Sequence, residues 1–134
     1  MHVLLINGSS RPAGCTYTAL RQVADTLEAE GITAEILHLG AAPIRDCTAC
    51  GGCKGKGRCV FPDDGINALI EKAQTADGFV FGTPVYYAHP SGRLLSALDR
   101  AFYAGGGMTH KPAAAVVSCR RGGASATFDR LNKY

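Results

Sequence analysis

VLLINGSSRPAGCTYTALRQVADTL, residues 3–27, holds a strand, a loop and a helix in that order. Val3–Ile6 is a continuous apolar run, which is typical of a strand buried on both faces. A polar loop containing two glycines follows, and the apolar residues then recur at helical spacing, at Leu20, Val23, Ala24 and Leu27. The stretch therefore predicts the opening of an alternating β-α fold.

The same alternation continues along the rest of the chain. Further strands are predicted at Ala34–Leu39, Gly78–Gly82 and Ala113–Ser118. Further helices are predicted to begin at Asp63 or Asp64, at Ser91, and at Ser125. Their inward faces are expected to hold Ile66, Leu69, Ile70, Ala73, Leu94, Leu95, Leu98, Phe102, Phe128 and Leu131. Strands that alternate with helices in this way predict an α/β fold with a doubly wound parallel sheet.

Length and composition limit the class of protein. The chain has 134 residues, 46% of them hydrophobic and 19% charged, which predicts a single globular domain. A net charge of +3 without a basic stripe argues against nucleic acid as a partner. No apolar run is long enough to span a membrane, and the N-terminus does not read as an export signal. We therefore expect a cytoplasmic protein whose thiols are kept reduced.

The loop after the first strand has the features of a phosphate site. Its hydroxyl groups come from Ser9, Ser10 and Thr16, and Arg11 adds a cation. Glycines allow the backbone N–H groups to approach a ligand, and the N-terminus of the following helix adds free donors and a partial positive charge. The loop is neither a Walker loop nor a G-x-G-x-x-G loop. The alternative is a plain strand-to-helix turn.

The loop after the third strand, GTPVYYAHPSGRL (82–94), is suited to a flat ring. Tyr86 and Tyr87 provide aromatic surfaces and hydroxyl groups, and two prolines stiffen the segment. Doubly wound sheets bind ligands beyond the carboxyl ends of their strands, where the strand order reverses. A phosphate site beside a ring-sized wall predicts a mononucleotide, for which FMN is the natural candidate. SCRRGGAS (118–125) follows the fourth strand, and either closes the far side of the ring or is a solvated turn.

These motifs resemble those of flavodoxin-like NAD(P)H-dependent FMN reductases, and within them the iron–sulfur flavoproteins. The resemblance rests on GSSRPAGCT, on C-x2-C-x2-C-x5-C followed by DD, on GTPVYYAHPSGRLLSALDR, and on GGASATFDRLNKY. It implies a strand order of 2-1-3-4 in a flavodoxin-like sheet, FMN as cofactor, and reduction by a nicotinamide cofactor. It also implies a homo-oligomer. A fifth strand, expected in the family, is not found in this chain, so the fourth strand is expected to be an open edge.

The resemblance assigns the cofactor contacts by position. It gives the FMN phosphate to Ser9, Arg11, Gly14 and Thr16, with Ser10 and Cys15 adjacent. It gives the isoalloxazine ring to Pro84, Val85, Tyr86 and Tyr87.

A long irregular segment, about residues 40–65, contains CTACGGCKGKGRC (47–59). Cys47, Cys50 and Cys53 follow the C-x2-C-x2-C spacing of bacterial ferredoxins, and Cys59 is the fourth thiol. A [4Fe–4S] cluster fits this compact spacing better than zinc, whose ligands usually come as two separated pairs. A loop that only shapes the flavin's surroundings, a zinc site and a disulfide pair remain alternatives. Cys119, at the end of a strand, is expected to be buried.

The predicted function is an FMN-dependent oxidoreductase. It takes hydride from NAD(P)H and passes electrons to a quinone, a flavin or a protein acceptor. The first alternative is an iron–sulfur flavoprotein that carries electrons through a [4Fe–4S] cluster. A second alternative, from another class, is a zinc-binding or redox-sensing module. No side chain is predicted to act as general acid or base, because the flavin performs the chemistry.

Overall fold

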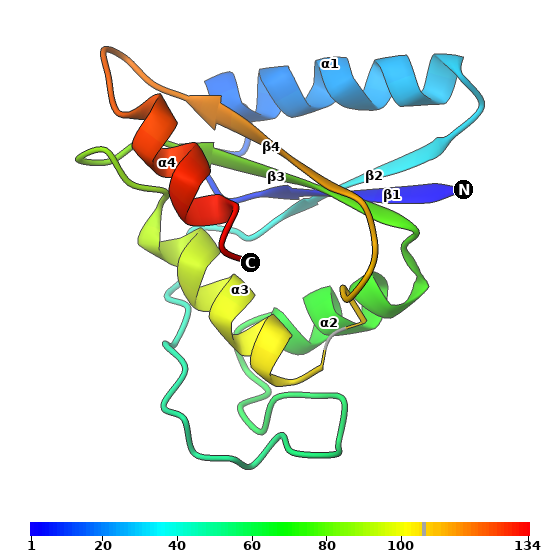
Figure 1. Ribbon diagram of the computed structural model, residues 1–134, viewed down its shortest axis with the longest axis vertical. Coiled ribbons are helices and arrows are strands. Elements are labelled where there is room, and N and C mark those ends of the chain that lie inside the picture. The colour runs from blue at the N-terminus through cyan, green and yellow to red at the C-terminus, as the bar shows by residue number, and fades with distance from the viewer. Residues whose placement is uncertain (106) are drawn as a thin grey trace.

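The computed structural model in Figure 1 describes residues 1–105 and 107–134. Four strands alternate with four helices in the described chain. In chain order these are β1 (His2–Asn7), α1 (Cys15–Ala29), β2 (Thr33–His38), α2 (Ile66–Thr75), β3 (Gly78–Pro84), α3 (Gly92–Tyr103), β4 (Ala113–Ser118) and α4 (Ala124–Leu131). The strands form one parallel sheet in the order β2-β1-β3-β4, which confirms the predicted fold class and strand order.

Helices cover both faces of the sheet (Figure 1). α1 lies on one face, where Leu20 and Ala24 pack against Val3, Leu5 and Val80. The other helices lie on the opposite face, which holds the larger core. Its fully buried side chains include Leu4, Ile6, Ile66, Leu69, Ile70, Leu94 and Leu98. Each strand therefore buries alternate residues on opposite faces, as a sheet covered on both sides requires.

Three sequence predictions about helix ends and burial were wrong. α2 does not begin at Asp63 or Asp64 but after Gly65, which caps it in the left-handed conformation. Phe128 was expected on the inner side of α4, yet it is 38% exposed. Cys119 is exposed rather than buried, because it lies just beyond the end of β4. The predicted cap of α3 is confirmed: the backbone N–H of Leu94 donates to the Ser91 hydroxyl at 3.3 Å.

The edge of the sheet at β4 is open, as predicted. β4 pairs only with β3 among the described strands. Ala113 and Ala114 are exposed at the start of this strand. None of the described helices is long and apolar enough to cross a bilayer.

The carboxyl ends of the strands meet at one end of the molecule, on the left in Figure 1. There the loop after β1 packs tightly on α3 and β3. The backbone N–H of Gly8 donates to the carbonyl of Gly82 at 2.8 Å. A Cβ atom added at Gly8 would lie 2.7 Å from Leu94 Cβ and 3.0 Å from the Gly82 oxygen. Only glycine fits this close approach.

Substituting Gly8→Ala should therefore destabilise the protein. The added methyl group meets a backbone oxygen and a Cβ atom, neither of which can move independently, so we expect a loss of about 1–3 kcal/mol. Urea unfolding measures it. Gly92→Ala is the matched control, because no atom of the described residues lies within 4 Å of its added Cβ. It should be neutral or stabilising by up to about 1 kcal/mol. Equal stability of the two variants would contradict the packing argument.

Candidate functional site

The loop between β1 and α1 is shaped by its own side chains. The backbone N–H of Ser9 donates to Asn7 Oδ1 at 3.0 Å, and the backbone N–H of Arg11 donates to Ser9 Oγ at 3.1 Å. Ser9 and Thr16 are buried, whereas Ser10, Arg11 and Cys15 are exposed. The predicted phosphate residues thus form one short loop that ends at the N-terminus of α1.

The chemistry of this loop fits a phosphate group. α1 has glycine at its N-cap, so no side chain of the cap occupies its free N–H groups, and no acidic residue lies in its first turn. Residues 8–16 contain no Asp or Glu. Asn7 is fully buried, and its Nδ2 has no hydrogen-bond partner among the described residues. Free N–H groups at a helix N-terminus and a nearby loop without carboxylates are consistent with a bound anion, and the unpartnered donor of Asn7 lies at the start of that loop.

The loop after β3 is a tight turn that projects two tyrosines. Val85 and Pro90 form a β-bridge, and the backbone N–H of Tyr86 donates to the carbonyl of His89 at 2.9 Å. Tyr87 and Ala88 have φ angles of 52° and 60°, in the left-handed region that is unusual for non-glycine residues. Tyr86 is 54% exposed and Tyr87 is fully exposed. Their assignment to a flavin ring stays a prediction, as does that of Pro84 and Val85.

Three loops meet at this edge of the sheet. Ser91 Oγ donates to the carbonyl of Gly8 at 2.7 Å, which joins the first loop to the start of α3. A Cβ atom added at Gly123 would lie 2.6 Å from Ala88 Cα and 3.1 Å from Val85 Cγ1. The loop after β4 therefore lies directly against the loop after β3. The sequence predicted the shared edge, and the structure adds this close contact at Gly123.

The four clustered cysteines line one cavity. Its volume is about 90 Å³, and its other lining residues include Phe61, Arg100 and Tyr103. One water molecule needs about 10–15 Å³ of such accessible space, so the cavity admits a group of several atoms. Across residues 1–105 and 107–134, no three His, Cys, Asp or Glu side chains lie close enough to share a single metal ion. All six cysteines, each within the described chain, are free thiols.

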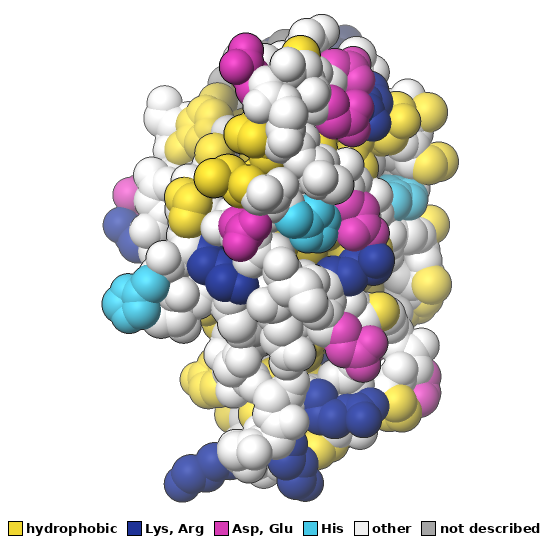
Figure 2. All heavy atoms as spheres, turned by 90° about the vertical axis from the view of Figure 1, so that its right-hand side faces the viewer, with side chains coloured by type: hydrophobic (Ala, Val, Ile, Leu, Met, Phe, Trp, Pro, Cys, Tyr) yellow, Lys and Arg dark blue, Asp and Glu magenta, His cyan; other side chains and the backbone are white. Residues whose placement is uncertain are grey.

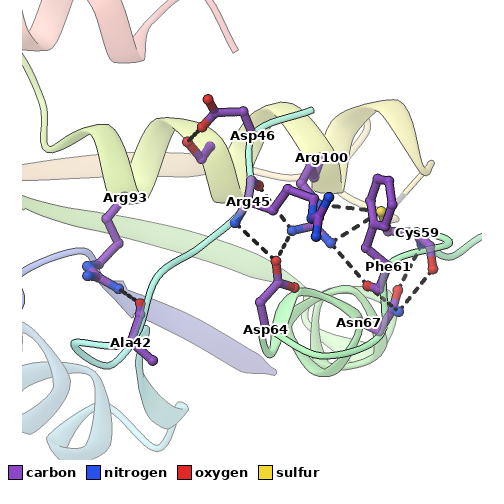
Figure 3. A network of polar contacts seen from close by, with 10 residues as sticks. Ala42, Arg45, Asp46, Cys59, Phe61, Asp64, Asn67, Arg93 and Arg100 are labelled. Atoms are coloured by element: carbon purple, nitrogen blue, oxygen red, sulfur yellow. Dashed lines mark hydrogen bonds and ion pairs between the residues drawn. The ribbon is translucent and has the colours of Figure 1, made fainter. Parts of the chain in front are cut away.

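Arg100 is the functional residue that sequence reasoning missed. It lies on α3 with 1% of its surface exposed, and its guanidinium group points at the Cys-rich segment (Figure 3). Its Nε and Nη2 donate to Cys59 Sγ at 3.4 and 3.3 Å. It also donates to the carbonyls of Arg45 and Phe61 and to the carboxylate of Asp64. Arg100 ends the motif GTPVYYAHPSGRLLSALDR (82–100), but nothing in that motif indicates a contact with the cysteines.

Asp64 and Arg100 are both held in their charged forms. Burial by itself raises the pKa of Asp64, but the hydrogen bonds from Arg100 and from the backbone N–H of Arg45 keep that pKa below its usual range. Burial lowers the pKa of Arg100, but the hydrogen bonds to Asp64 and Cys59 outweigh it and raise that pKa. The pair is therefore ionic across the neutral pH range.

Asn67 fixes the backbone of Cys59 from the first turn of α2. The backbone N–H of Cys59 donates to Asn67 Oδ1 at 2.8 Å, and Asn67 Nδ2 donates to the carbonyl of Cys59 at 3.0 Å. These two bonds hold residue 59 without touching its sulfur. Cys53 is held separately, since its Sγ donates to the carbonyl of Tyr103 at 3.5 Å.

The Cys-rich segment carries positive charge. Lys54, Lys56 and Arg58 are all exposed, and residues 47–60 contain no acidic residue. Figure 2 shows Lys and Arg side chains at the end of the molecule where this segment lies in Figure 1. Cationic side chains beside the cysteines offset the negative charge that thiolate ligands would bring.

The comparison with protein families matches residues 1–134 to the NADPH-dependent FMN reductases. This chain belongs to that family. Membership confirms the resemblance stated from the sequence. The oxidoreductase class, FMN and the nicotinamide cofactor expected from the sequence are those of the family.

Individual relatives add detail. An iron-sulfur flavoprotein of Methanocaldococcus jannaschii is 32% identical over the whole chain, which covers 71% of that protein. An iron-sulfur flavoprotein of Archaeoglobus fulgidus is 38% identical over 75% of the chain, which covers 49% of that protein. The chain spans about half the length of most of the curated relatives it matches.

The fold itself is shared with solved flavoenzymes. FerB, a flavoenzyme NAD(P)H:(acceptor) oxidoreductase from Paracoccus denitrificans, superposes with a TM-score of 0.72 at 21% identity. The match covers 98% of this chain and 69% of FerB. At this identity the likeness shows the fold alone, and it agrees with the flavodoxin-like sheet described above.

Proposed function

We propose that residues 1–134 form one flavin-binding domain of an FMN-dependent oxidoreductase that takes hydride from NAD(P)H. The observation that carries this proposal is the acid-free loop at the N-terminus of α1, which follows directly after Asn7 and its buried, unpartnered Nδ2. Family membership supports the same reading. The electrons pass to a quinone, a flavin or a protein acceptor.

Each loop has a separate task in this proposal. The loop after β1 and the first turn of α1 bind the phosphate through Ser9, Ser10, Arg11, Gly14, Cys15 and Thr16. The loop after β3 places Pro84, Val85, Tyr86 and Tyr87 beside the ring, and leaves one face open to the nicotinamide. Bound FMN would accept the hydride and release electrons one or two at a time. The protein contributes binding and orientation, and no side chain is required as acid or base.

The cysteine cavity supports a second component. We propose that Cys47, Cys50, Cys53 and Cys59 hold a [4Fe–4S] cluster, which would exchange single electrons with the flavin or a partner. The four cysteines line one cavity, and several relatives are named iron-sulfur flavoproteins. With the cluster present, the protein acts mainly as an electron carrier. Without it, the protein acts as a reductase.

The compartment and the oligomeric state of the protein are also part of the proposal. Six free thiols suit a reducing compartment, so we propose that the protein works in the cytoplasm. We also propose a homo-oligomer, as the resemblance to the FMN reductases implies.

One anaerobic preparation tests both parts of the proposal. Its absorbance spectrum, iron and zinc content, and rate of NAD(P)H oxidation are measured together. We expect about one FMN per chain and, with one cluster, about four irons. Flavin without iron would leave the reductase alone. No flavin after addition of FMN would contradict the main proposal, and zinc in place of iron would favour a metal-binding or redox-sensing module.

A further inference from the structure

Arg100 uses every hydrogen-bond donor it has. A guanidinium group carries five N–H bonds. The five bonds from Arg100 go to the Arg45 carbonyl, the Phe61 carbonyl, the Asp64 carboxylate and, twice, the sulfur of Cys59. Figure 3 shows the side chain between the Cys-rich segment and the first turn of α2. Two donors from one rigid group therefore converge on a single sulfur atom.

This arrangement is costly unless the sulfur carries charge. Burying a guanidinium group costs free energy because the charge loses its contact with water. Carboxylates paired with the group usually compensate for that cost. Here one carboxylate is present, and two of five donors are directed at a thiol, which in its neutral form is a weak acceptor. A thiolate bound to iron is a better acceptor, because hydrogen bonds to charged groups are stronger.

Asp64 is placed to limit the positive charge of Arg100. Its Oδ2 accepts from Arg100 and, at 3.2 Å, from the backbone N–H of Arg45. Its Oδ1 is buried and has no hydrogen-bond partner within the described residues. Asp64 does not contact the cysteine sulfurs directly, so its charge acts on Cys59 only through the field and through Arg100.

We propose that Arg100 is a positioning residue that sets the reduction potential of the cluster through its two hydrogen bonds to Cys59. The inference rests on the proposed cluster. A cluster held by these cysteines would place more negative charge on its ligand sulfurs after gaining one electron from a reductant, without any bond forming or breaking. A fixed cation that donates to one sulfur stabilises the reduced form more than the oxidised form. Arg100 therefore raises the reduction potential of the cluster, and the negative charge of Asp64 partly cancels that increase.

The test is a redox titration of the holoprotein with dithionite and mediators, followed by electron paramagnetic resonance. Arg100→Gln removes the cation and should lower the ratio of reduced to oxidised cluster about tenfold at a fixed potential, a shift of about 59 mV for one electron. Arg100→Lys keeps the charge but not the paired donors, and should shift the potential in the same direction by less.

Asp64→Asn should shift the potential in the opposite direction. The amide keeps an oxygen for Arg45 and Arg100, and its nitrogen takes the place of Oδ1, which has no hydrogen-bond partner within the described residues. Loss of the negative charge then strengthens the effect of Arg100, so the reduced fraction rises. A purely structural disturbance would not produce shifts of opposite sign.

Arg93→Gln is the matched control. Arg93 lies two turns earlier on α3 and anchors the same segment through the carbonyls of Ala41 and Ala42, without touching a cysteine. Its removal should leave the potential of the cluster unchanged.

The outcomes separate this inference from the proposed function. Wild-type protein without iron would overturn the cluster itself, and this inference with it. If the wild-type protein holds a cluster and the position-100 variants have the same reduction potential, the proposed role of Arg100 is overturned and the cluster is not. Position-100 variants that fold but contain no cluster would also overturn this role, because Arg100 would then be needed to assemble the cluster. If Arg100→Gln does not fold, the Arg100→Lys variant decides: a lowered potential supports the inference, and an unchanged or raised potential overturns it.

Discussion

Cys15→Asp should weaken FMN binding about 30-fold while leaving the protein without FMN at least as stable as before. Cys15 is exposed at the first position of α1, where the proposed phosphate site lies. A carboxylate there favours the helix by roughly 0.3–1 kcal/mol, because it complements the positive end of the helix dipole. The same carboxylate repels a phosphate group. An exposed pair of unit charges interacts by at most about 1 kcal/mol, and a phosphate group carries nearly two negative charges, so the repulsion is about 2 kcal/mol.

Titration of FMN into the apoprotein, followed by flavin fluorescence, measures the affinity. Cys15→Asn is the matched control, because it has the shape of Asp without the charge. The difference between the two variants should shrink as salt is added, since exposed charges are screened. Equal affinities for Asp and Asn at low salt would contradict a phosphate site at this helix end. Urea unfolding of the apoproteins confirms that affinity and stability move in opposite directions.

Most of the fold was predictable because its signals are local. The apolar runs of the strands and the helical spacing of Leu20, Val23, Ala24 and Leu27 depend only on near neighbours. β4 was placed at its observed bounds, and Ser91 caps α3 as expected. The side-by-side position of the loops after β1 and β3 followed from the rule that parallel strands end at one edge.

The errors arose where a distant contact overrides a local preference. Asp64 is a good helix cap by type, but its carboxylate is taken by Arg100, which lies 36 residues later in the chain. Gly65 therefore caps α2 instead. In α4 the buried pair is Thr127 and Leu131, four residues apart, and Phe128 falls on the neighbouring, exposed face. Helical spacing alone does not choose between these two faces.

The candidate site shows the same division. Spacing predicted that the four clustered cysteines act together, and this stays a prediction; in the structure they line one cavity. Spacing could not predict that Arg100 and Tyr103 of α3 complete that cavity, because helix and loop are far apart in sequence. A buried arginine becomes visible only when its partners are known, since the same residue on a solvated helix face looks identical in sequence.

Cys50→Ser should abolish the cluster and leave the flavin in place. Cys50 is exposed, so replacing its sulfur with oxygen removes no packing. Hydrogen bonds from the Gly52 backbone N–H and then the Thr48 hydroxyl lower the pKa of Cys50, which favours the thiolate that iron binds. Serine does not supply that thiolate, and a [4Fe–4S] cluster needs its cysteine ligands. Iron should fall from about four per chain toward none.

Cys119→Ser is the matched control for Cys50→Ser. Cys119 is also exposed, but it lies beyond the end of β4 and does not line the cysteine cavity. Iron content, the broad absorbance of the cluster and bound FMN are measured on both variants, prepared anaerobically. Loss of iron in Cys50→Ser alone assigns the cluster to the Cys-rich segment. Full iron in Cys50→Ser would remove Cys50 from the ligand set. Loss of iron in both would mean that the metal depends on general thiol content rather than on this cavity. Because both substitutions are conservative and exposed, a difference between them reports ligation and not folding.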